Sequence, residues 1–176
     1  ENMAEISIEN SKITSLARQQ LSIIGKHHKS PTGGTLFATT TLSEIEVGVM
    51  PTLIVGAAQV IVGELSPIVT AYGSDNTKLT FDIEKSRWGD ALPSAFADNI
   101  KMYIVANVVQ SVLNMSVPDI APKYTSDAQL LLASLVKMAF VKKPPGTSVT
   151  VYNVSGTVTI EDNEKTDGYN KDNKTT

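Results

Sequence analysis

Apolar residues recur at helical spacing along residues 11–28, near the start of the chain. They return every three or four positions, while Arg18, Gln19 and Gln20 take the opposite side. A glycine followed by cations, Gly25 to Lys29, favours a helix C-terminus at the end of this range. The pattern predicts an amphipathic helix whose buried face consists of Ile13, Leu16, Ala17, Leu21 and Ile24.

The second pattern is a run of 17 residues without charge, from Val47 to Gly63. A membrane-spanning helix needs ~20 predominantly apolar residues, whereas this shorter run contains a glutamine and a proline. We therefore favour a buried helix that is kinked or restarted at Pro51 over a membrane span. The alternation along residues 59–62 is also compatible with a strand.

The strongest helical pattern extends from Ser94 to Met115, and no charge occurs between Lys101 and Asp119. A helix that is apolar nearly all round must be covered nearly all round. In a chain of 176 residues, we expect a neighbouring subunit to supply part of that cover. The residues expected at this subunit interface are Trp88, beside a turn, and Tyr103, Val105, Val108, Val109 and Val112.

A last helix is predicted from about Ser126 to Lys143, because Pro144 and Pro145 stop it. Its spacing predicts that five apolar side chains face inward: Leu130, Leu131, Leu135, Met138 and Ala139.

Period-two alternation predicts strands in two places. Residues 78–84 alternate polar and apolar, and residues 149–160 form a predicted hairpin around Ser155-Gly156. Together these segments predict a small three-stranded sheet beside a bundle of about four helices, a mainly α fold. We expect residues 1–160 to form this domain and residues 161–176 to form a polar tail, flexible unless a partner orders it.

Composition argues against catalysis. The chain has no cysteine, which excludes thiolate nucleophiles and cysteine-ligated metals. Its histidines, His27 and His28, are adjacent, so on a helix their side chains point about 100° apart and do not form a natural metal pair. None of the common nucleotide-binding, hydrolase or zinc motifs is present. We expect no enzymatic activity, no cofactor and no metal.

The net charge of −3 and the scattered lysines give no reason to expect nucleic acid as the main partner. Four lysines at predicted helix ends could nevertheless touch phosphate if an assembly lines a DNA passage: Lys26, Lys29, Lys142 and Lys143. Favourable interaction with helix dipoles and solubility explain these positions equally well.

Several stretches resemble head-to-tail connector (adaptor) proteins of tailed phages, of the kind found in phages and prophages of Bacteroides-type bacteria. The resemblance covers roughly Ile13 to Pro145 through loose helix signatures. In the first predicted helix these are residues 18–21 and 24–26. In the C-terminal helical pair they are residues 96–109, 116–119, 123–124, Ala128, 131–132 and 140–144.

This resemblance implies a ring of about twelve subunits beneath the portal, in the virion neck between capsid and tail. The implied partners are other copies of the chain, the portal protein and tail proteins, with passing contact to phage DNA and none to a membrane. Assembly would take place in the host cytoplasm.

A different hypothesis also fits the residues. The chain would then be a small soluble helical domain with a binding or regulatory role, of an immunity or anti-defence type, acting as an oligomer. The mass of the protein in solution and in phage particles distinguishes the two.

Overall fold

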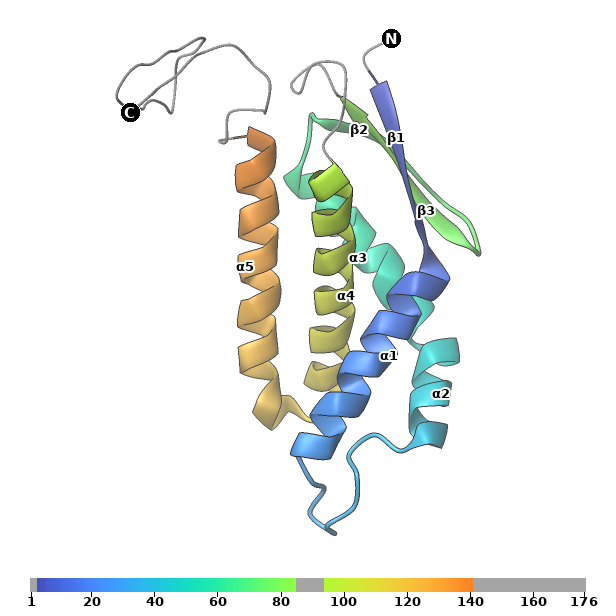
Figure 1. Cartoon of the computed structure of the whole chain (residues 1–176), viewed down its shortest axis with the longest axis vertical. Helices are drawn as coiled ribbons and strands as arrows, with labels where there is room; N and C mark the ends of the chain where they lie inside the picture. The colour runs from blue at the N-terminus through green and yellow to red at the C-terminus, as the bar shows by residue number, and fades with distance from the viewer. Residues whose placement is uncertain (1–2, 85–93, 141–176) are drawn as a thin grey trace, which may run out of the picture.

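The computed structural model describes residues 3–84 and 94–140, which form a helical bundle with a small sheet at one end (Figure 1). Helices hold 69% of these residues, so the predicted mainly α fold with a small sheet is confirmed. The elements in chain order are β1 (Met3–Glu9), α1 (Asn10–His27), α2 (Thr39–Gly48), α3 (Met50–Glu64), β2 (Val69–Ser74), β3 (Lys78–Glu84), α4 (Ser94–Ser116), the 3₁₀ turn η2 (Pro118–Ile120) and α5 (Ala121–Phe140).

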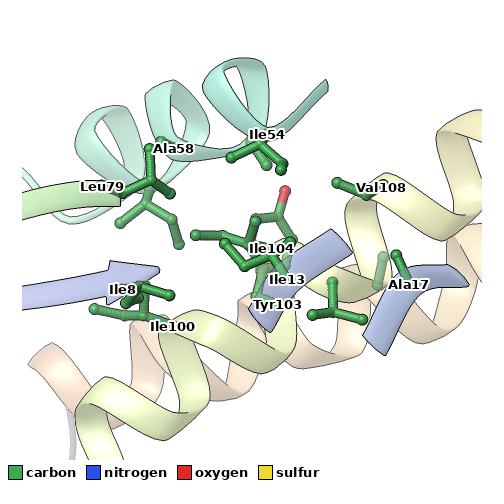
Figure 2. Close-up of a cluster of buried hydrophobic side chains, with 14 of the residues drawn as sticks. Ile8, Ile13, Ala17, Ile54, Ala58, Leu79, Ile100, Tyr103, Ile104 and Val108 are labelled. Atoms are coloured by element: carbon green, nitrogen blue, oxygen red, sulfur yellow. The ribbon is translucent and has the colours of Figure 1, made fainter. Parts of the chain in front are cut away.

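Helix α4 is the centre of the bundle. It packs against α5 on one side and against α1 and α3 on the other (Figure 1). The predicted range of this helix, Ser94 to Met115, agrees with the structure to within one residue. Figure 2 shows its Ile100, Ile104 and Val108 among buried side chains of the other helices and the sheet. Burial of this apolar surface is the main force that holds the bundle together.

The sheet is antiparallel, with strand order β1-β3-β2. The predicted strand at 78–84 is confirmed, and its apolar side chains Leu79, Phe81 and Ile83 are fully buried against the helices. Strand β3 is paired on both of its edges. The expectation that residues 149–160 pair with it is therefore wrong, because β1 and β2 already occupy those positions. The hairpin predicted at 149–160 itself lies outside the described residues.

Helix α1 agrees with the predicted range to within one residue at each end. Its Gly25 is buried and packs closely against Phe37. A Cβ at this position would lie 3.2 Å from the backbone nitrogen of Phe37, so a larger residue would not fit without movement. On the same helix Arg18 donates a 2.8 Å hydrogen bond to Glu46 and a 3.2 Å bond to Ser43, both on α2. These contacts fix α2 against α1.

The charge-free run divides between two helices that are bent by 54° at their junction. Pro51 lies in the first turn of α3, where a missing N–H costs nothing, so the predicted restart at this residue is confirmed. Residues 59–62 are helical, which excludes the strand alternative. Within the described ranges no single helix has the length and hydropathy of a membrane span, although the bent pair α2–α3 has them together.

Helix α5 begins at Ala121, five residues earlier than predicted. Pro122 is tolerated because it lies in the first turn. The buried face of α5 repeats every seven residues before a last buried alanine, and it consists of Ala121, Ala128, Leu135 and Ala139. The inward orientation predicted for Leu130 is wrong: this side chain is 68% exposed, since it lies on the side of the helix opposite that repeat.

Candidate interaction surfaces

The helical residues predicted to form a subunit interface are instead part of the core of a single chain. No more than 3% of the surface of any of them is exposed: Tyr103, Val105, Val108, Val109 and Val112. Three elements of the same chain, α1, α3 and α5, pack around α4 and supply the cover that the apolar pattern requires. The remaining interface candidate, Trp88, lies outside the described residues. The five buried side chains of α4 are therefore not available to a partner protein in this fold.

A network of hydrogen-bonded, uncharged polar side chains extends along α4 and onto α5. Asn107 donates a 2.7 Å hydrogen bond to the hydroxyl of Tyr103 and accepts one of 3.3 Å from Ser111. Burial raises the pKa of Tyr103, opposed by this bond from Asn107, so the hydroxyl is protonated at neutral pH.

Further along the same helix, Gln110 donates a 3.0 Å hydrogen bond to Ser111 and accepts one of 2.9 Å from Asn114. Thr125 on α5 donates to Gln110 over 3.0 Å, which links the two helices. Because these side chains bond to one another across the two helices, the network orients α5 on α4. The recurrence of amide and hydroxyl residues at helical spacing was visible in the sequence, but only the structure shows that they bond to one another.

Of the lysines predicted to touch phosphate, Lys26 and Lys29 are exposed at the C-terminal end of α1. Lys142 and Lys143 lie outside the described residues. The C-terminal end of α5 lies at the other end of the bundle from the C-terminal end of α1 (Figure 1). Two exposed lysines at one end form a small positive surface, too small to define a nucleic-acid site by themselves.

The ionisable groups of residues 3–84 and 94–140 contain no cluster of three or more that could hold a metal ion. Neither His27 nor His28 uses its imidazole in a hydrogen bond or an ion pair within these ranges. Asp75 accepts hydrogen bonds from the N–H groups of Thr77 and Lys78 and from the Thr77 hydroxyl. These bonds hold the pKa of Asp75 below its usual range and close the turn between β2 and β3.

The outer face of the sheet is acidic. In the register of β1 and β3, Glu5 lies directly opposite Asp82 and Met3 lies opposite Glu84, while Glu9 faces Lys78. Like charges directly opposite one another on a sheet are unfavourable. A partner that covers this face is therefore expected to be neutral or basic.

A shallow groove of about 230 Å³ lies between the end of β1 and the first turns of α4. The side chains along it carry both signs of charge, two lysines and two carboxylates, and none of them is joined to another by an ion pair. Mixed charge at an open surface does not define a small-ligand site. The groove is lined by Ser7, Ile8 and Glu9 of β1, Lys12 of α1, and Ala97, Asp98 and Lys101 of α4.

Six large apolar side chains are exposed on the described helices. Scattered exposed apolar residues are ordinary on a soluble protein, but α5 packs mainly on α4 and η2 and leaves its opposite side open. The six residues are Ile23, Val47, Met102, Met115, Leu130 and Phe140.

Comparison with known proteins found no matching family model, no matching curated protein and no matching solved structure.

Proposed function

We propose that this chain is a non-enzymatic assembly subunit that forms an oligomeric ring between the portal and the tail of a tailed phage. The observation that carries the proposal concerns residues 3–84 and 94–140: they form a hydrophobic core, and within them one edge of β1 and one side of α5 have no covering element. A ring subunit needs contact surfaces of this kind and no active site.

The resemblance to connector proteins supports the same assignment. Its longest matching stretch, residues 96–109, lies on α4, and further matches lie on η2 and α5. The proposed partners are other copies of this chain, the portal protein and tail proteins. Of the four lysines expected to touch phosphate, Lys26 and Lys29 lie within the described residues and are exposed, and we propose them for passing contact with DNA. The proposed location is the virion neck, after assembly in the host cytoplasm.

One observation favours the alternative, a small soluble helical domain with a binding or regulatory role. Tyr103 and the four valines of α4 that were expected at an interface are covered within a single chain, so these residues do not require a neighbour to complete the core. A small binding or regulatory domain with such a core could be stable as a monomer as well as in an oligomer.

Two measurements on the full chain separate these functions. Light scattering coupled to size exclusion gives its mass across a range of concentrations, and immunoblotting of purified particles shows whether it is part of the virion. A ring mass in solution, or presence in particles, supports the connector. A monomer at every concentration that is also absent from particles overturns it, and an oligomer absent from particles favours the regulatory domain.

A further inference from the structure

The two outer edges of the sheet differ in regularity. Strand β2 is interrupted by an irregularity between Val69 and Ala71 and contains Gly73, and features of this kind make an edge a poor template for pairing. Strand β1 pairs with β3 over seven consecutive residues without a bulge, and it contains neither glycine nor proline. The regular edge is therefore the one suited to accept another strand.

The outer edge of β1 is also unoccupied by the described part of the chain. Its pairing partner is β3, and no other backbone hydrogen bond reaches residues 3–9. The groove lined by Ser7, Ile8 and Glu9 runs beside it, with α4 as its opposite wall. A strand added to a sheet lies about 4.8 Å from its neighbour and satisfies such a row of backbone groups.

The sequence after α5 contains a segment with the composition of a strand. Thirty-six residues follow Phe140, and the stretch from Pro144 to Ile160 carries no charge. Within it, residues 149–154 read Val-Thr-Val-Tyr-Asn-Val, a pattern typical of strands. Because it is neutral, such a strand would add no like charge beside Glu5 and Glu9.

We propose that the free edge of β1 accepts residues 149–154 of a second copy of this chain as an added strand. Helix α5 lies on one side of α4, whereas β1 lies on the other (Figure 1). A copy that accepts a segment at β1 and donates its own segment to the next copy makes a head-to-tail contact. Head-to-tail contacts of this type close into a ring when the rotation between neighbours permits.

This inference rests on the proposed function, because it specifies how neighbouring subunits of the ring would join. The absence of cysteine allows a direct test by disulfide crosslinking. One protein carries Ser7→Cys, on the exposed side of β1. It is mixed with a second full-length protein, of different size through a tag, that carries Thr150→Cys, Tyr152→Cys or Val154→Cys, three positions on one face of a strand.

The matched control for the acceptor is Ala71→Cys, which is exposed on the irregular edge strand β2. Groups held together in a complex react at an effective concentration near millimolar, so at about 10 μM protein the Ser7→Cys mixture should crosslink on the order of 100-fold faster than the control mixture. Equal rates for the two acceptors overturn the proposal. So does a disulfide that forms only within one chain of a double variant, since the occupant would then be the chain's own segment.

A second variant tests the donor without cysteine. Val151→Pro removes a backbone donor from the proposed strand, and Thr166→Pro makes the same substitution outside it. We expect Val151→Pro to lose the oligomer mass of the unsubstituted chain while it keeps the same melting temperature, and Thr166→Pro to keep both. An unchanged oligomer mass for Val151→Pro overturns strand addition and leaves the ring proposal standing. A monomeric unsubstituted chain that is absent from particles overturns both.

Discussion

Val108 decides between two roles for the apolar surface of α4. If this residue belongs to the core of a single chain, its truncation must lower the free energy of unfolding of the monomer. If it belongs to a subunit interface, truncation must instead weaken association. The side chain is fully buried by elements of its own chain, with an exposed fraction of 0%, so we predict a loss of monomer stability for Val108→Ala.

The magnitude follows from the two carbon atoms that the substitution removes. Transfer accounts for about 0.8 kcal/mol per buried carbon, hence about 1.6 kcal/mol. Imperfect collapse of the cavity raises the total to about 2–3 kcal/mol. For a protein of this size, where 1 kcal/mol corresponds to about 2–4 °C, the melting temperature should fall by about 5–10 °C.

Val47→Ala is the matched control, because it makes the same chemical change in a helix at a side chain that is 80% exposed. Its effect on stability should lie within about 0.5 kcal/mol. Both variants are followed by circular dichroism on heating, at a protein concentration where light scattering shows a monomer. Equal melting temperatures for the two variants would refute the core assignment. If Val108→Ala kept the melting temperature of the unsubstituted chain but associated more weakly, Val108 would belong to a subunit interface.

Three further predictions concern single contacts. Arg18→Ala should lower the free energy of unfolding by about 0.5–1 kcal/mol at low salt and by less at 1 M salt, because its ion pair is one-third exposed; no salt dependence would contradict this. Gly56→Ala has open space at the added Cβ, so it should raise the free energy of unfolding by about 0.5–1 kcal/mol. Gly25→Ala should lower it by about 1 kcal/mol, because the added Cβ overpacks against Phe37. Urea titration measures both changes, and changes of the opposite sign would contradict the geometry. The lowered pKa of Asp75 means that its contribution is present above its unfolded pKa of about 4 and is lost as pH falls toward the folded value. As the pH falls, the free energy of unfolding of Asp75→Asn should decrease less than that of the unsubstituted chain. Identical pH profiles would show that protonation of Asp75 does not affect stability.

The helices were predictable because each pattern is local. The spacing of Ile13, Ala17 and Leu21 on α1, and the alternation that defines β3, identified those elements to within a residue. Strand β1 was missed although Ile6 and Ile8 alternate with polar residues, since two apolar positions are a weak signal. Its partner β3 lies about seventy residues further along the chain, and such a pairing cannot be inferred from local periodicity.

The α4 residues of the interface prediction proved to be core residues for a different physical reason. The apolar pattern of α4 correctly indicated that the helix is surrounded, but a pattern on one helix does not say which chain provides the surroundings. Here α1 and α3 cover one side of α4 and α5 covers the other, so its valines are buried within the same chain. Among residues 3–84 and 94–140, the surfaces open to an association are the regular backbone edge of β1 and the open side of α5. Association through a backbone edge depends on strand geometry more than on apolar side chains. A proline in the donor strand should therefore disrupt oligomers more than truncation of exposed apolar residues such as Leu130, and the opposite order would place the contact on α5.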